Sequence, residues 1–119
     1  MSIPDQSALP PDPEISRALD TMWARHRSQI LERVVVLEAA ASAVTEKNFT
    51  AADRDAAHAA AHKLAGTLGM FNLMRGTDLA RELEQIYTQQ AFPAPSSGEH
   101  LASLAAELRI MIENRKSSG

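Results

Sequence analysis

The chain has 119 residues, with 12 lysines and arginines against 15 aspartates and glutamates, which gives a formal charge of −3. This length suits a single domain, and the slight acidity argues against a nucleic-acid-binding module, which normally carries a basic surplus. Cysteine is absent, so disulfides, thiol catalysis and cysteine-based zinc sites are excluded. The hydrophobic fraction of 45% includes 21 alanines and few aromatic residues, which favours closely packed helices over a sheet.

Four of the six prolines fall within residues 1–13, and proline disfavours helix both at its own position and at the residue before it. This segment has neither the basic region nor the apolar region of a signal peptide. No apolar run approaches the roughly 20 residues that span a bilayer. We therefore expect a cytoplasmic protein, without membrane or nucleic-acid contacts, in which a flexible leader (residues 1–13) precedes one helical domain (residues 14–116).

Two helical patterns occupy the first part of this domain. Apolar residues recur at steps of three and four over residues 14–44, as they do on one face of a helix. Thr50 and Asp53 then form a helix-start signature, a threonine N-cap followed three residues later by a carboxylate. The second helix should run to about Phe71, with Asn72 taking a left-handed conformation at its end.

Two further helices are predicted in the second part. A tight connection near residues 74–76 leads to a third pattern over residues 79–87, and residues 92–98 form a loop rich in proline, serine and glycine. A last helix covers residues 101–112. Four amphipathic helices with short loops predict an all-α fold, an antiparallel up-down-up-down four-helix bundle behind the N-terminal leader. Each helix has a single apolar stripe, so we expect a monomer.

The most informative segment is residues 57–71, in the second predicted helix. A helix turns about 100° per residue, and on this step the apolar side chains of the segment lie opposite His62. His62 is therefore expected to point away from the core. Small or polar residues lie within about 60° of it on the same face: His58, Ala59, Ala65, Gly66 and Gly69.

Two glycines inside a helix cost about 1 kcal/mol each relative to alanine. Neither Gly66 nor Gly69 marks the helix end, because Leu68 and Phe71 continue the core spacing. A face of glycine and alanine lets another surface approach while the imidazole stands clear, which suits a nucleophile that enters another protein's active site. Two plainer interpretations stay open: the glycines admit a neighbouring helix, or His62 is only a solvated side chain.

Other chemistries have weaker signals. His58 and His62 have the spacing of a helical metal pair, but no glutamate lies between them and no spacing marks a third ligand. Glycine-rich phosphate loops are absent, so no cofactor is expected. The carboxylates Glu82 and Glu84 look like ordinary solvated charges, and His26 lies on an apolar stripe, where a core histidine is expected.

Residues 61–67, AHKLAGT, resemble the phosphorylation motif of histidine-containing phosphotransfer (HPt) domains, which reads AHxLKG or AHxLAG. The continuation LGMFNL and then LARELE is similar to the next hairpin of that family. The resemblance covers roughly residues 15–115, and its specific part is residues 61–84. It implies a four-helix bundle whose exposed histidine shuttles a phosphoryl group between receiver-domain aspartates of hybrid histidine kinases and response regulators.

By this resemblance His62 is the phosphoacceptor, Gly66 gives clearance for the receiver, and Lys63 helps to hold the phosphate. Ala65 stands where many members have lysine, and Asn72 where glycine is frequent. No carboxylate cluster is marked for Mg²⁺, so the partner would supply metal and catalytic groups, and the chain would be a carrier rather than an enzyme. Two alternatives are a bundle that docks receivers without being phosphorylated, and a metal-binding bundle that uses His58 and His62.

Overall fold

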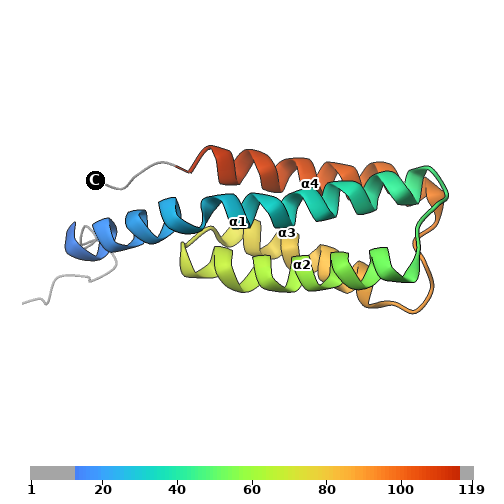
Figure 1. The fold of residues 1–119 in the computed structure, drawn as a ribbon, viewed down its shortest axis with the longest axis horizontal. Helices are drawn as coiled ribbons and strands as arrows, with labels where there is room; N and C mark the ends of the chain where they lie inside the picture. The colour runs from blue at the N-terminus through green and yellow to red at the C-terminus, as the bar shows by residue number, and fades with distance from the viewer. Residues whose placement is uncertain (1–12, 116–119) are drawn as a thin grey trace, which may run out of the picture.

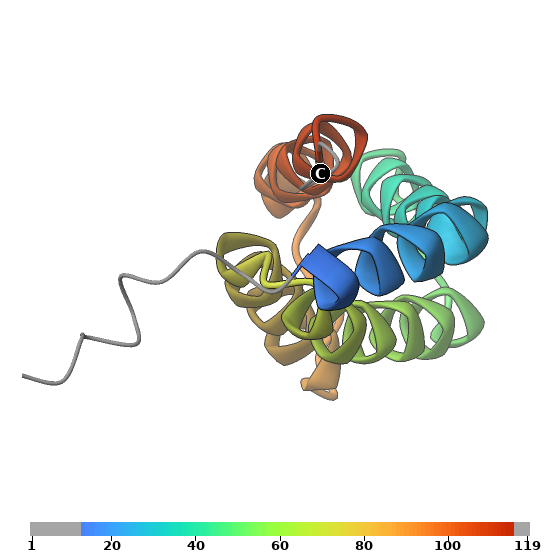
Figure 2. The ribbon, with the colours of Figure 1, turned by 90° about the vertical axis from the view of Figure 1, so that its left-hand side faces the viewer.

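The structure is a computed structural model that describes residues 13–115, so all of the predicted leader except Pro13 lies outside the described residues. It contains four α-helices and one short 3₁₀ helix: α1 (Pro13–Thr45), α2 (Ala51–Met70), α3 (Met74–Thr88), η2 (Pro95–Ser97) and α4 (Gly98–Glu113). Successive α-helices run in opposite directions (Figure 1). Seen from one end, they surround a common interior (Figure 2). The predicted all-α four-helix bundle is confirmed, and no strand occurs within residues 13–115.

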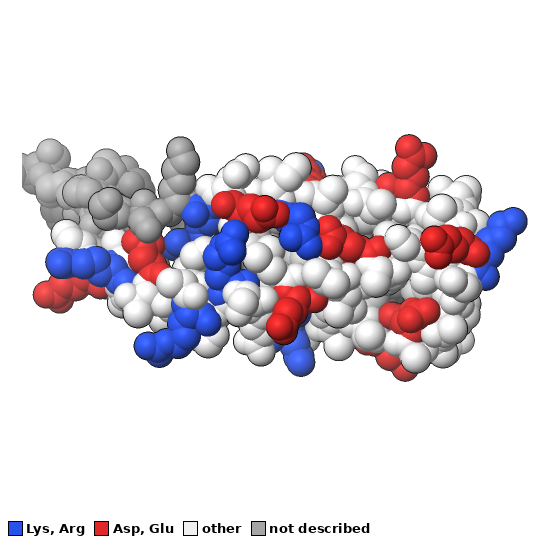
Figure 3. Space-filling model, turned by 45° about the horizontal axis from the view of Figure 1, so that its top comes forward, with Lys and Arg blue, Asp and Glu red and all other residues white. Residues whose placement is uncertain are grey.

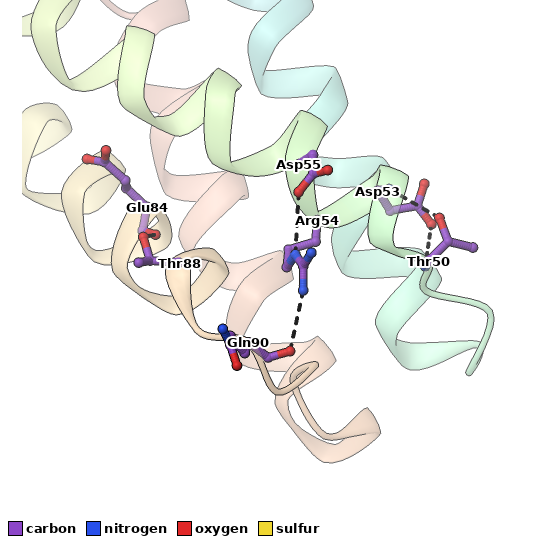
Figure 4. A network of polar contacts seen from close by, with 7 residues as sticks. All are labelled: Thr50, Asp53, Arg54, Asp55, Glu84, Thr88 and Gln90. Carbon is purple, nitrogen blue, oxygen red and sulfur yellow. Dashed lines mark hydrogen bonds and ion pairs between the residues drawn. The ribbon is translucent and has the colours of Figure 1, made fainter.

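The start of α2 follows the local sequence signal. The Thr50 backbone N–H donates to Asp53 Oδ2 at 2.9 Å, and the Asp53 N–H donates to Thr50 Oγ1 at 3.2 Å (Figure 4). Each side chain thus satisfies a backbone donor that the first turn of a helix leaves open. At the other end of α2, Asn72 has a φ of 62°, the left-handed conformation expected for it.

The connection between α2 and α3 differs from the prediction. It is formed by residues 71–73, and α3 begins at Met74, so Gly76 lies inside a helix rather than in a turn. The reason is tertiary packing, because Gly76 is buried and a Cβ added there would lie 3.0 Å from Leu68 Cδ1. A glycine that looks like a turn signal instead allows α3 to approach α2 closely.

The core is aliphatic and rich in alanine, as the composition predicts. Helix α1 packs against α2 and α4, and α3 packs against the same two helices. Trp23 and Phe71 meet edge to face at one end, with ring centroids 5.0 Å apart. At the other end α4 begins so close to α1 that a Cβ added to Gly98 would overlap Thr45 Oγ1.

Two arginines of the C-terminal region join distant parts of the chain. Arg109 donates two hydrogen bonds to Glu38, at 2.6 and 2.8 Å, and these bonds hold the pKa of Glu38 below its usual value. Arg115 pairs with Asp20 at 3.2 Å and lies over the rings of Trp23 and Phe71. On the face seen in Figure 3, charges of both signs lie close together. Within residues 13–115, no helix is long and apolar enough to cross a membrane.

Candidate functional site

His62 lies near the middle of α2 and points away from the core. Its side chain is 71% exposed, whereas Ala61 and Leu64 on the inner side of the same helix are completely buried. The outward orientation expected from the helical spacing is therefore confirmed. An imidazole in this position is accessible to a large partner without any rearrangement of the bundle.

The imidazole is held by a carboxylate from the neighbouring helix. His62 Nδ1 lies 2.6 Å from Glu84 Oε2, and Glu84 is a half-buried residue of α3. A carboxylate only accepts hydrogen bonds, so this contact places the ring proton on Nδ1. In the neutral imidazole, Nε2 then keeps its lone pair, and the side chain that carries it is largely exposed. Such a fixed tautomer is what a histidine nucleophile needs.

The register of α2 and α3 explains why Glu84 reaches His62. Thr77 Oγ1 donates to the carbonyl of Ala65 at 3.2 Å in the buried seam between the helices. Glu84 lies two turns further along α3, and Thr88 Oγ1 donates to the Glu84 carbonyl at 2.7 Å on the next turn (Figure 4). Because the two helices are antiparallel, this advance along α3 brings Glu84 to the level of His58 and His62.

Glu84 corrects the sequence interpretation, in which it was an ordinary solvated charge. Local spacing could not identify it, because 22 residues separate it from His62 and the contact depends on the α2–α3 register. Its neighbour Glu82 turns to another helix, where it lies 3.3 Å from His100 Nε2 in α4. The only sequence signal for Glu84 was the LARELE segment of the HPt resemblance.

Gly66 resolves one of the open interpretations. A Cβ added to Gly66 would meet nothing within 4 Å among the described residues, so this glycine does not admit a neighbouring helix. Ala59 and Lys63 are also exposed. Gly69 is exposed as well, but a Cβ there would contact Thr77 Oγ1 at 3.5 Å, so it borders α3.

Ala65 does not belong to the exposed face, contrary to expectation. It is only 7% exposed, because α3 covers that flank of α2 and Thr77 binds the Ala65 carbonyl. Ala65 therefore offers little surface to a docked partner. The accessible surface around His62 is asymmetric, closed towards α3 and open on the side of Gly66 and Lys63.

His58 lies beside the same carboxylate but does not complete a metal site. Its Nε2 is 3.8 Å from Glu84 Oε2, and its side chain is 41% exposed. Within residues 13–115, no three histidine, aspartate or glutamate side chains are placed to hold a metal ion. The structure thus gives the metal-binding alternative no third ligand.

A shallow groove of about 220 Å³ lies between α1 and α2. Its walls include both apolar and basic side chains: Met22, His26, Gln29, Ile30, Arg33, Thr67, Met70 and Phe71. His26 is exposed here, so the expectation of a core histidine was wrong. It sits at the edge of the stripe that packs against α2, and its ring remains in solvent.

We compared the sequence with protein families and with known proteins. A family model described as "Hpt domain" matches residues 21–118. "Protein RcaC" of Microchaete diplosiphon is 35% identical over 66 residues, which is 56% of this chain and 10% of that protein. The chain therefore spans about a tenth of the length of this relative. No solved structure gives a significant match.

Proposed function

Since the chain belongs to the Hpt domain family, the phosphotransfer modules of two-component phosphorelays, we propose that His62 is its phosphoacceptor. In this proposal His62 accepts a phosphoryl group from the aspartate of one receiver domain and passes it to the aspartate of another. The observation that carries the assignment is the exposed imidazole whose Nδ1 is bound by Glu84 at 2.6 Å. No other described histidine combines such exposure with so short a contact to a carboxylate.

The proposed step uses the lone pair of Nε2. This atom attacks the phosphorus of the aspartyl phosphate, the P–Nε2 bond forms, and the bond from phosphorus to the aspartate oxygen breaks. The electron pair of that bond leaves with the aspartate as a free carboxylate. The proton on Nδ1 stays in place, and the Glu84 carboxylate stabilises the positive charge that develops on the ring, as preorganised charges do in transition states. The return step reverses each of these changes.

The division of labour follows from the chemistry of phosphoryl transfer, which depends mainly on positioning and charge neutralisation. We propose that this chain acts as a monomeric carrier that presents the nucleophile, and that the receiver supplies Mg²⁺ and the other catalytic groups. The open flank formed by Ala59, Lys63 and Gly66 gives a receiver room to approach His62. Lys63 adds a positive charge on that flank.

A phosphotransfer assay tests the site. A receiver domain phosphorylated with acetyl phosphate and Mg²⁺ is mixed with wild-type protein, His62→Gln or His58→Gln, and the transferred label is tested for acid lability. His58→Gln is the matched control, since it removes a histidine that faces the same carboxylate. We expect acid-labile label on the wild type and on His58→Gln, and none on His62→Gln. Label that persists on folded His62→Gln would disprove the assignment.

The same assay separates the docking-only alternative. A bundle that binds receivers without accepting phosphate would bind a receiver in a pull-down or calorimetric titration yet take up no label. That result across a panel of receivers would replace the carrier proposal. The open face around His62 would then serve only for recognition.

A further inference from the structure

We propose that Arg81 of α3 binds the phosphoryl group carried by His62. This inference rests on the proposed function and adds to it a residue of the LARELE segment that lies outside both the AHKLAGT motif and the expected site residues. The negative charge of Glu84 creates an electrostatic problem at the site. Arg81 can solve it because of its level along α3, the side of α3 on which it lies, and its lack of a partner within residues 13–115.

The electrostatic problem is the negative charge of Glu84. Its carboxylate lies 2.6 Å from His62 Nδ1, so the phosphoryl group must approach an imidazole that already has an anion on its other side. Like charges this close repel one another unless a cation compensates. Residue 65, where the resembling motif often has lysine, is a buried alanine in this chain. Besides Lys63 and the Mg²⁺ proposed for the receiver, a cation from another helix of the bundle would reduce this repulsion.

The α2–α3 register brings Arg81 to the level of His62. Thr77 is fixed opposite Ala65 by its hydrogen bond, and Glu84 is fixed opposite His58 and His62 by its contacts with both rings. In an antiparallel pair, each step forward along α3 corresponds to one step back along α2. Arg81 lies between Thr77 and Glu84, at a level within about one residue of His62 by the helical rise.

Arg81 also lies on the correct side of α3. Ala80 and Leu83 are buried in the core, whereas Arg81 is exposed. Three residues separate Arg81 from Glu84, which places the arginine about 60° further round the helix and further from the core. His62 points away from the core in the same sense. The long stem of an arginine can therefore carry its guanidinium across the exposed edge of the seam towards Nε2.

Arg81 has no competing partner inside the described bundle. Arg54, Arg75, Arg109 and Arg115 each form an ion pair within residues 13–115, but no ion pair or hydrogen bond of the Arg81 side chain occurs there. A guanidinium presents a planar set of donors that matches the oxygens of a phosphate and stays protonated throughout. Arg81 thus changes no bond in the transfer and compensates charge on the three non-bridging phosphoryl oxygens.

Lys63 complements this arrangement from the opposite flank. It follows His62 directly and lies about 100° round α2, on the side away from α3. With Arg81 on the α3 side, a phosphoryl group on Nε2 is placed between two cations. Arg81 therefore supplies, from a different helix, the charge that a lysine at residue 65 would supply.

The test compares transfer to wild type, Arg81→Lys, Arg81→Gln and Arg81→Glu from a receiver phosphorylated with acetyl phosphate and Mg²⁺. Arg75→Gln is the matched control, because it removes an arginine of the same helix that pairs with Glu107. We expect the maximal transfer rate to fall about three- to tenfold in Arg81→Gln, less in Arg81→Lys and more in Arg81→Glu. The difference should shrink in high salt, because exposed charges are screened. Equal melting temperatures would exclude a structural cause.

The outcomes separate this inference from the proposed function. If Arg81→Gln and Arg81→Glu both accept phosphate at the wild-type rate while His62→Gln accepts none, the role of Arg81 is refuted and the carrier function stands. If wild-type protein takes up no label from any phosphorylated receiver, both proposals fail. A fall that is as large in Arg75→Gln, or that is unaffected by salt, would also refute phosphate binding by Arg81.

Discussion

Gly66 offers a sharp test of why a helix keeps a residue that weakens it. A Cβ at Gly66 would enter open space, so Gly66→Ala creates no clash among the described residues. Alanine inside a helix is favoured over glycine by about 0.8–1.0 kcal/mol. For a domain of about 100 residues, that gain raises the melting temperature by about 3–5 °C. We therefore expect Gly66→Ala to be more stable than the wild type.

The assay for this gain is thermal unfolding followed by circular dichroism. Gly76→Ala serves as the matched control, because its new Cβ would lie 3.0 Å from Leu68 Cδ1 in the seam between α2 and α3. We expect the control to lose stability while Gly66→Ala gains it. A lower melting temperature for Gly66→Ala would refute the reasoning, since it would reveal an internal contact that requires the glycine.

The functional half of the prediction uses Gly66→Leu. A leucine one turn from His62 fills the space that a docking receiver needs, so we expect a fold as stable as the wild type and a fall in kcat/KM for phosphotransfer of at least about tenfold, as steric clashes at interfaces produce. If Gly66→Leu is at least as stable as the wild type but has lost phosphotransfer, Gly66 is identified as a docking residue. Wild-type transfer by folded Gly66→Leu would contradict that role.

Three further predictions concern single contacts. Glu84→Gln keeps an acceptor for His62 but removes the charge, so transfer should slow about three- to tenfold, and an unchanged rate would exclude Glu84 from the mechanism. Burial raises the pKa of Tyr87, the sole tyrosine, to about 12, against about 10 in an unfolded chain. The contribution of Tyr87 to the free energy of unfolding is complete below pH 10 and is lost as the pH rises towards 12. In the folded protein the phenolate absorbance should therefore appear near pH 12, and Tyr87→Phe should remove this pH dependence of stability. A titration midpoint near pH 10 in the folded protein would contradict the raised pKa. Gly98→Ala should lower the free energy of unfolding by about 1–3 kcal/mol, because its Cβ would overlap Thr45 Oγ1. A melting curve identical to that of the wild type would show that α1 and α4 can move apart at this point without loss of stability.

The sequence predicted what depends on local patterns. The spacing of apolar residues located four helices, the Thr50–Asp53 pair located the start of α2, and Asn72 located its end. These features depend on residues within a few positions of one another. The same holds for the outward direction of His62, which follows from the opposite position of the core side chains on one helix.

The predictions that were wrong depend on contacts between one helix and the next. A helical projection places Ala65 and Gly66 at similar angles on either side of His62, so it cannot show that α3 covers Ala65 and leaves Gly66 open. Glu84 was missed for the same reason, since its role depends on the register of two helices. Gly76 was assigned to a turn because its contact with Leu68 is tertiary.

The separation of contacts along the chain has a consequence for how the protein opens locally. The contacts of the site, Thr77 with Ala65 and Glu84 with His62, join residues 12 and 22 positions apart. The arginine pairs at Glu38 and Asp20 join residues 71 and 95 positions apart. Closing a longer loop costs more chain entropy, and local opening takes place in units smaller than the domain. We therefore expect fraying of α1 and α4 at their paired ends to leave the hairpin of α2 and α3 in register, with the imidazole still held by its carboxylate.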